Sequence, residues 1–208
     1  MTLSVALCET CGLFVALLAD EGRVVANGVP MRSRAAAIFT LLKCVERRLP
    51  ASALLSVARA AREGCGELAS HAEALGELAA GRADHGSVPV LRLFPLREHP
   101  WLTPLQARVV RLTLSIPKGW VASYKQLSDI LGLQPRAVAR ALSANPYPVA
   151  YPCHRVVRSD GRLGGYLGSA RLCWLKARLL LGEGVVVRGL RVSREHFTPS
   201  LPPLGRPP

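Results

Sequence analysis

Short apolar runs open the chain, and longer amphipathic stretches follow them. Ser4–Cys8, Leu13–Ala19 and Val24–Val29 are short apolar segments of the kind that form strands. From Ser33 to about Gly81, apolar residues recur at helical spacing among Ala, Arg and Glu. We therefore expect residues 1–95 to form an N-terminal domain that combines short strands with helices.

Helical patterns dominate residues 100–190. Two short helices are predicted at about 123–131 and 135–144, with Ser123 as the N-cap of the first and Gly132 in the tight turn between them. Such a pair is either a DNA-binding helix-turn-helix or an ordinary helical hairpin of a protein core. The predicted fold class is thus mixed α/β (α+β), with a small N-terminal α/β domain and a mainly helical C-terminal domain.

Proline-rich stretches separate and end these domains. Residues 95–104 contain three prolines and are predicted to form a linker. Residues 191–208 contain five prolines and show no hydrophobic periodicity. We expect this tail to be disordered or draped over the surface.

Positive charge is concentrated in the second half of the chain. The 208 residues carry a formal net charge of +13; residues 1–99 hold 11 Lys and Arg against 10 Asp and Glu, and residues 100–208 hold 16 against 4. This asymmetry favours a polyanionic partner, most simply nucleic acid, with a solubility device or codon bias as the alternatives. Arg136 and Arg140 lie one turn apart on the second short helix, which favours DNA.

Several classes of protein do not fit the composition. No apolar stretch approaches the roughly 18–20 residues that span a bilayer, and no signal-peptide pattern opens the chain. Six scattered cysteines are too few for a secreted disulfide scaffold. We expect a soluble protein of the cytoplasm, without a membrane partner.

Cys153 is the first candidate for chemistry. It follows a proline and precedes His154 and Arg155, a base and a cation that would lower the pKa of a thiol. Neighbouring side chains of a strand point apart, so a bridging water would be needed to carry the proton to His154. From these residues alone, Cys153 is either a nucleophile or a buried structural cysteine.

Cys8 and Cys11 form a second cysteine pattern. On either side of a tight turn between two strands, they would face each other at disulfide distance. Half of a zinc site and two free thiols are the alternatives, and no His or Cys pair elsewhere completes a metal site. His71, His85, His99 and His196 have no partner pattern and are expected at the surface.

A set of motifs in residues 100–185 resembles one known family, the O6-alkylguanine-DNA alkyltransferases, or methylated-DNA–protein-cysteine methyltransferases. The spacing is most similar to the archaeal members. The motifs are Ile116-Pro117-x-Gly119-x-Val121-x-Ser123-Tyr124, Pro135-Arg136-Ala137-Val138, Asn145-Pro146, Pro152-Cys153-His154-Arg155-Val156, Gly165-Tyr166, Lys176 and Glu183.

The resemblance implies roles for the chemical groups. Cys153 would be the alkyl acceptor and would release its proton through a water to His154, which Glu183 would hold. Tyr124 would hydrogen-bond the guanine and help to neutralise its leaving anion. From the residues alone, Glu183 is also a solvated carboxylate at a helix end, and Tyr124 a buried anchor of its helix.

The resemblance also implies how the substrate is held. Arg136 would enter the space left by an extruded nucleotide, and Asn145 would tie a turn of the backbone. The further DNA-binding residues would be Arg140, Ser123 and Ala137, and the substrate pocket would contain Val156, Gly165, Tyr166, Leu167, Ser169 and Lys176. The family often has Ser where Leu167 stands, and the following loop is about three residues longer here, so Ser169 is a candidate substitute.

These implications give the expected function. It is DNA repair by direct, stoichiometric and irreversible alkyl transfer from O6-alkylguanine in duplex DNA to Cys153 after base flipping, with O4-alkylthymine left open as a second substrate. The enzyme would be a single-turnover methylated-DNA–protein-cysteine S-methyltransferase that needs no cofactor or metal and acts as a monomer. The N-terminal domain would be ribonuclease-H-like. The rivals are a lesion sensor, which would lack Cys153, and a sequence-specific helix-turn-helix regulator.

Overall fold

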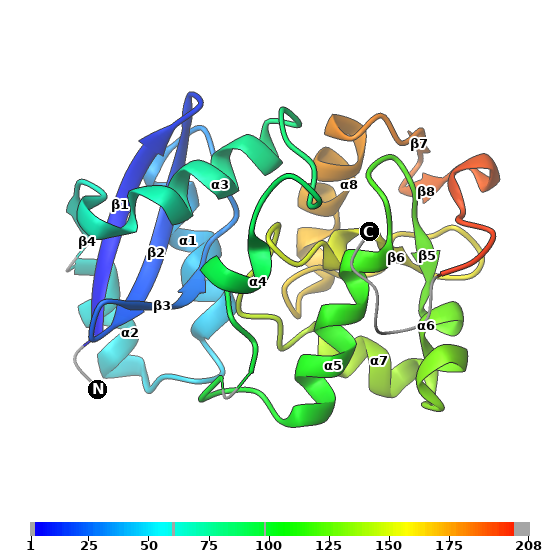
Figure 1. Ribbon diagram of the computed structural model, residues 1–208, viewed down its shortest axis with the longest axis horizontal. Coiled ribbons are helices and arrows are strands. Elements are labelled where there is room, and N and C mark those ends of the chain that lie inside the picture. The colour runs from blue at the N-terminus through cyan, green and yellow to red at the C-terminus, as the bar shows by residue number, and fades with distance from the viewer. Residues whose placement is uncertain (1–2, 60, 98, 202–208) are drawn as a thin grey trace.

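A computed structural model describes residues 3–59, 61–97 and 99–201 of the chain. Strands dominate one end of the molecule and helices the other (Figure 1). The helices and strands of the first half are β1 (Leu3–Thr10), β2 (Leu13–Asp20), β3 (Arg23–Asn27), α1 (Arg34–Val45), α2 (Ala51–Arg59), β4 (Ala61–Glu63), α3 (Ala69–Ala79) and α4 (Val90–Leu93).

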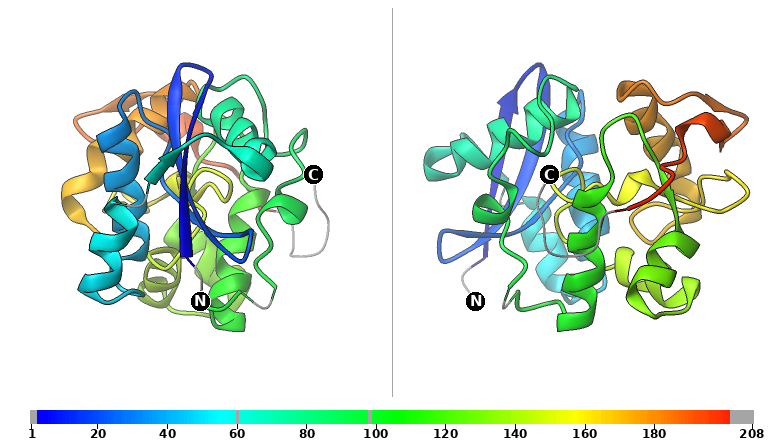
Figure 2. Two further views of the ribbon diagram at one scale, coloured as in Figure 1. Left: turned by 90° about the vertical axis from the view of Figure 1, so that its left-hand side faces the viewer. Right: turned by 45° about the vertical axis from the view of Figure 1, so that its right-hand side comes forward.

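A four-stranded sheet organises the first half, in the order β3-β2-β1-β4. The pairs β1–β2 and β2–β3 are antiparallel, and β4 joins β1 in parallel. Residues 15–19 of the central strand β2 are all buried, which requires cover on both faces of the sheet. Helices α1 and α2 supply it on one side and α3 on the other (Figure 2).

Of the three alternatives for Cys8 and Cys11, the structure shows two free thiols and not the possible disulfide. Strand β1 continues to Thr10, so Cys11 and Gly12 form the turn itself, with φ of 57° and 68°. Cys8 then lies within the strand, buried and opposite Val15. Among the described residues, no group of three metal-ligating side chains occurs that would complete a zinc site.

The second half is mainly helical, as expected. Its helices, 3-10 turns (η) and strands are α5 (Pro104–Leu112), η2 (Thr113–Ser115), β5 (Ala122–Ser123), α6 (Tyr124–Leu131), α7 (Pro135–Leu142), η3 (Cys153–Arg155), β6 (Val156–Val157), η4 (Ala170–Leu172), α8 (Cys173–Gly182), β7 (Val187–Arg188), β8 (Arg191–Val192) and η5 (Arg194–His196).

Helices α6 and α7 form the predicted helix-turn-helix. The Ser123 hydroxyl accepts a hydrogen bond from the Gln126 amide and the Gln126 side chain accepts from the Ser123 amide, so the start of α6 is a capping box. Gly132 ends the helix in the left-handed conformation at φ 66°. Pro135 then begins α7, where its missing N–H leaves no helical bond unmade.

One hydrophobic core runs through both halves. The segment before Cys153 is fixed to the first half, because Tyr147 donates to the Val24 carbonyl and Tyr151 to the Phe94 carbonyl, each at 2.8 Å. The predicted linker is also packed: His99 is buried and lies 2.9 Å from the Val25 carbonyl. The expectation that His99 is a surface residue is therefore wrong.

Residues 191–201 lie on the surface, but they are ordered by backbone hydrogen bonds. Strand β8 pairs with β7, and the Val121 and Thr198 amides donate to the His196 and Val121 carbonyls at 2.8 Å. Composition cannot reveal such bonds, because they join backbone groups that nearly every residue carries. The prediction for residues 202–208 lies outside the described residues. No helix in the described part of the chain is long and apolar enough to cross a membrane.

Candidate active site

Cys153 begins the short turn η3, directly after the stiff Pro152. Its side chain is buried, and its sulfur accepts a hydrogen bond of 3.2 Å from the Asn145 side-chain amide. The same amide nitrogen donates to the Tyr151 carbonyl, and the Asn145 oxygen accepts from the Tyr147 amide. Asn145 thus ties the turn after α7 to the cysteine.

Burial controls the charge of the thiol. It raises the pKa of Cys153, while the Asn145 hydrogen bond and the nearby positive charge of Lys176 lower it in part. The net direction is upward, so the resting sulfur is a protonated thiol. A nucleophilic Cys153 therefore needs a base that removes its proton during the reaction.

His154 and Glu183 form a buried pair beside Cys153. The His154 Nε2 lies 2.8 Å from the Glu183 carboxylate, which sits at the C-terminal end of α8. Arg155 donates to both oxygens of the same carboxylate at 2.9 Å. Burial lowers the pKa of His154, and the Glu183 charge offsets part of that shift. Nδ1 of His154 is buried and has no partner among the described residues.

The carboxylate of Glu183 stays ionised in this network. Burial alone would raise its pKa, but the charges and hydrogen bonds of His154 and Arg155 outweigh burial and hold the pKa well below its usual range. The resulting anion fixes the imidazole with Nε2 toward Glu183. Glu183 is therefore not the solvated helix-end residue that its sequence alone also allows.

His85, from the first half, completes the network, and the expectation that it is a surface residue without a partner is wrong. Its Nδ1 lies 3.2 Å from a terminal nitrogen of Arg155, and its Nε2 lies 2.8 Å from the Val149 carbonyl. Burial lowers the pKa of His85 to about 4, with the Arg155 charge adding to the shift. A neutral His85 can accept from Arg155 and donate to Val149. No sequence signal marks it, because its partners lie 64 and 70 residues away.

Lys176 and Tyr124 also lie near the cysteine. Lys176 is almost wholly buried, donates to the Val156 carbonyl and lies 5.7 Å from the centre of the Tyr124 ring. Burial lowers the pKa of Lys176 to about 8 and raises that of Tyr124 to about 12. Val156 and Lys176, which were expected in the pocket, are buried and are not among its described lining residues.

A pocket of about 200 Å³ opens in front of Cys153. The predicted pocket residues Gly165, Tyr166, Leu167 and Ser169 all line it. Tyr166 and Ser169 exchange two backbone hydrogen bonds of 2.9 Å, which holds the loop closed on itself. The other lining residues are Tyr124, Ala139, Leu142, Ser143, Gly168 and Ala170.

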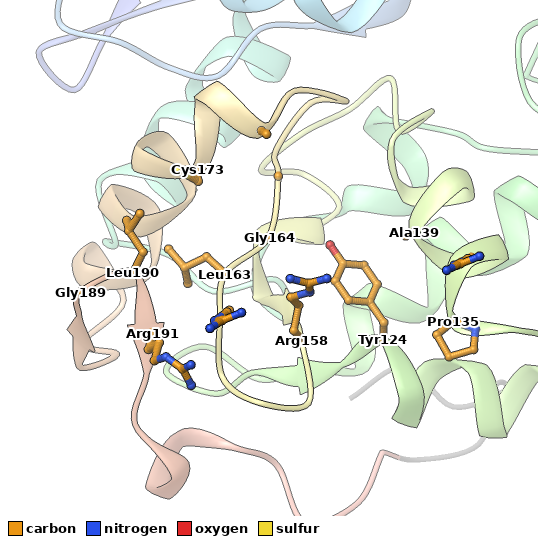
Figure 3. A pocket seen from close by; sticks show the side chains of 14 residues that line it. Tyr124, Pro135, Ala139, Arg158, Leu163, Gly164, Cys173, Gly189, Leu190 and Arg191 are labelled. Carbon is orange, nitrogen blue, oxygen red and sulfur yellow. The ribbon is translucent and has the colours of Figure 1, made fainter.

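A wider groove of about 730 Å³ adjoins the pocket and shares Tyr124, Ala139, Gly165 and Ala170 with it. Tyr124 lies between Arg158 and Pro135 in this groove (Figure 3). The four arginines of its described lining are Arg136, Arg158, Arg162 and Arg191.

The predicted DNA-binding residues are not all in this groove. Arg136 lines it, near the start of α7. Arg140 is exposed but lines a separate basic pocket with Lys43, Arg47 and Arg48, at and just after the end of α1. Ser123 is buried and its hydroxyl caps α6, while Ala137 is half-buried on α7.

Residues 104–185 match one described family domain, the "6-O-methylguanine DNA methyltransferase, DNA binding domain". This part of the chain belongs to that family. It contains every residue of the Cys153 site except His85. The assignment agrees with the resemblance that the motifs carry.

Relatives and solved structures support the methyltransferase domain. The chain is 47% identical over 87 residues to the methylated-DNA–protein-cysteine methyltransferase of Methanothermobacter thermautotrophicus, covering 42% of this chain and 48% of the relative. It is 47% identical over 86 residues to that of Pyrobaculum aerophilum, covering 40% and 56%. The chain thus spans about half the length of these curated relatives.

Structural similarity extends over most of the chain. The O6-methylguanine-DNA methyltransferase of Pyrococcus kodakaraensis superposes with a TM-score of 0.59 at 27% identity, over 88% of this chain and all of that one. The fold is also that of Mycobacterium tuberculosis OGT, described in complex with DNA, with a TM-score of 0.56 at 22% identity, over 86% and 92%. The mixed α/β fold outside the methyltransferase domain is therefore also shared.

Proposed function

We propose that this protein repairs duplex DNA by moving the alkyl group of O6-alkylguanine to Cys153, once per molecule. The position of Cys153 carries the proposal: its thiol lines a pocket that opens into the arginine-lined groove of a methyltransferase-family DNA-binding domain. The buried His154–Glu183 pair supplies the base that the protonated thiol needs.

The transfer is a displacement at the alkyl carbon. The Cys153 proton passes through a water to Nδ1 of His154, whose Nε2 is held by Glu183. The sulfur–carbon bond forms as the carbon–O6 bond breaks, and the electron pair of that bond goes to the guanine. Tyr124 donates a hydrogen bond to the leaving anion, which finally takes up the proton that the thiol lost. Guanine and a stable thioether result, and no cofactor enters this balance.

A base inside a duplex cannot reach Cys153, so the lesion must leave the helix. Arg136 lines the groove beside the pocket, near the start of α7, where its planar guanidinium can fill the gap in the base stack. Asn145 holds the backbone of the pocket, and Leu167 and Ser169 shape its loop. O4-alkylthymine would present its alkyl oxygen to the same sulfur. Each molecule needs one site and acts as a monomer in the cytoplasm.

Mass spectrometry tests the transfer directly. After incubation with duplex DNA that contains O6-methylguanine, we expect one added methyl group on Cys153 and none on the other five cysteines. Cys153→Ala is expected to leave the lesion intact, while Cys65→Ala, a matched control whose residue lines neither the pocket nor the groove, is expected to repair it. An unmodified Cys153 in the wild type would refute the proposal and favour a lesion sensor or a DNA-binding regulator.

Comparing two substrates tests base flipping. Arg136→Ala should slow repair of duplex DNA by roughly 10-fold or more, because the few kcal/mol needed to unstack a base are no longer offset. Its reaction with free O6-benzylguanine should be unchanged, since that base needs no flipping. Equal losses on both substrates would exclude a flipping role, and specific binding to one undamaged sequence would support a regulator.

A further inference from the structure

The chain continues past residue 185, where the methyltransferase-family domain ends, and returns to that domain as a hairpin. Strands β7 and β8 pair through Val187 with Val192 and Arg188 with Arg191. The hairpin then docks on the loop that follows Val157. The Leu163 amide donates to the Leu190 carbonyl at 3.0 Å, and the Val192 amide to the Gly161 carbonyl at 2.9 Å.

Gly161 shows that this docking is specific to the loop sequence. Its φ is 86°, in the left-handed region, and a Cβ there would lie 2.8 Å from the Val192 carbonyl oxygen. Only glycine allows the two backbones to approach so closely. The loop and the hairpin therefore form one surface.

That surface is strongly basic on the side that faces the groove. Arg158 and Arg162 come from the loop and Arg191 from the hairpin, and the described lining of the groove contains no carboxylate. Arg191 donates to the Asp160 carbonyl at 2.9 Å, which fixes its side chain over the loop and leaves other N–H groups free to bind a ligand. The Asp160 carboxylate lies 3.6 Å from Arg162 and offsets one charge.

The basic surface continues from the Cys153 pocket. The groove shares four lining residues with that pocket, and Tyr124 lies at their junction. Figure 3 shows Arg158 and Arg191 on the side of Tyr124 away from Pro135 of α7. A strand whose nucleotide enters the pocket would thus pass Arg136 on one side and these arginines on the other.

We propose that the β7–β8 hairpin extends the DNA-binding surface beyond the family domain, with Arg191, Arg158 and Arg162 holding backbone phosphates of the strand that carries the lesion. This inference rests on the proposed function for the identity of the DNA. Arginine suits the task because its planar guanidinium binds phosphate oxygens in pairs. The contacts would position the duplex without reading its sequence.

Salt dependence of binding tests the hairpin. Affinity for a short fluorescein-labelled duplex without a lesion is measured by anisotropy over a series of salt concentrations. Loss of one phosphate contact in Arg191→Ala should lower the slope of log affinity against log salt by about 0.9 and weaken binding about fivefold at low salt. Arg194→Ala is the matched control, because Arg194 is exposed, lies in the same segment and does not line the groove.

Each outcome decides the matter. A reduced slope for Arg191→Ala alone, restored by Arg191→Lys, supports a phosphate contact, with thermal unfolding confirming that the variants fold. An unchanged Arg191→Ala overturns the proposal, because Arg191 then contacts no phosphate. An equal loss in Arg194→Ala also overturns it, because net charge alone then explains binding. Reaction with free O6-benzylguanine, which has no phosphate, should be normal in every variant. If the wild type does not react with free O6-benzylguanine, the proposed function is refuted. The salt dependence still tests DNA binding by the hairpin on its own.

Discussion

At the scale of single residues, burial keeps the Cys153 thiol protonated until the reaction begins. Burial raises the pKa of the Cys153 thiol, so the resting sulfur is protonated and reacts slowly with solvent oxidants. Reactivity then depends on removing the proton inside the pocket. The partners needed for that step are buried with the cysteine, and His154 and Arg155 are both hydrogen-bonded to Glu183.

Removing the charge of Glu183 tests this dependence. Glu183→Gln takes away the anion that stabilises a protonated His154, so we expect alkylation of Cys153 by free O6-benzylguanine to slow roughly 100-fold. The variant should also unfold more readily, because Arg155 loses its buried partner. The rate is followed by mass spectrometry at several pH values.

Two controls separate chemistry from folding in that experiment. Glu195→Gln makes the same chemical change at an exposed position and should react at the wild-type rate. The Glu183→Gln rate is compared at a temperature where circular dichroism shows both proteins folded. A folded Glu183→Gln protein that reacts as fast as the wild type would show that His154 needs no anionic partner.

Sequence reasoning found the residues of this site that lie in one motif and missed those that the fold brings in. Cys153 and His154 are adjacent in sequence, and Glu183 follows at a family spacing. His85 and the Arg155 contact depend on a loop of the first half, so no local pattern could indicate them. Val156 and Lys176 carry the right identity, but their burial follows from packing.

At the scale of elements, local chemistry predicted the helix ends well. Ser123, Gly132 and Pro135 define the ends of α6 and the start of α7 because their effects act within one turn. Pairing between distant segments was less predictable. Strand β4 carries no apolar run, and β8 lies in a proline-rich stretch, so each exists only because a partner strand is present.

Substitution of two glycines with positive φ distinguishes the cost of backbone strain from the cost of a steric clash. Gly132→Ala should lower the free energy of unfolding by about 1–2 kcal/mol, because its Cβ would meet nothing within 4 Å and only the left-handed conformation is penalised. Gly161→Ala should lower it further, since its Cβ would also clash with the Val192 carbonyl. Urea unfolding measures the free energy lost in each variant. Equal losses would show that the hairpin moves away from the added methyl group at no cost.

At the scale of the whole molecule, the first half acts as a platform for the segment that leads to Cys153. Asn27 binds the Pro146 and Pro148 carbonyls, and the two buried tyrosines of the segment reach carbonyls of the first half. The near-neutral charge of this half gives no indication of a role in the chemistry. The contact of His85 with Arg155 shows that it also supports the site.

The buried His99 gives the platform a defined sensitivity to acid. Its Nδ1 accepts from the Trp101 amide at 3.2 Å and its Nε2 lies 2.9 Å from the Val25 carbonyl, so the imidazole is neutral. Burial lowers its pKa from 6.5 to about 4, with the charges of Arg23 and Arg48 adding to the shift. The proton is therefore taken up mainly by the unfolded chain. The contribution of the neutral His99 to stability is fully present above about pH 6.5 and is lost as the pH falls toward 4.

His99→Gln removes this titration while keeping a side chain that can donate to Val25. Between pH 6.5 and 4 the wild type should lose as much as about 3 kcal/mol through His99, and the variant should lose correspondingly less. Some slope will remain in the variant, because the pKa of His85 is also lowered to about 4. Urea unfolding at intervals across this range measures the difference. Parallel curves for the two proteins would mean that a charged His99 is accommodated in the core, and that the acid sensitivity of the platform arises elsewhere.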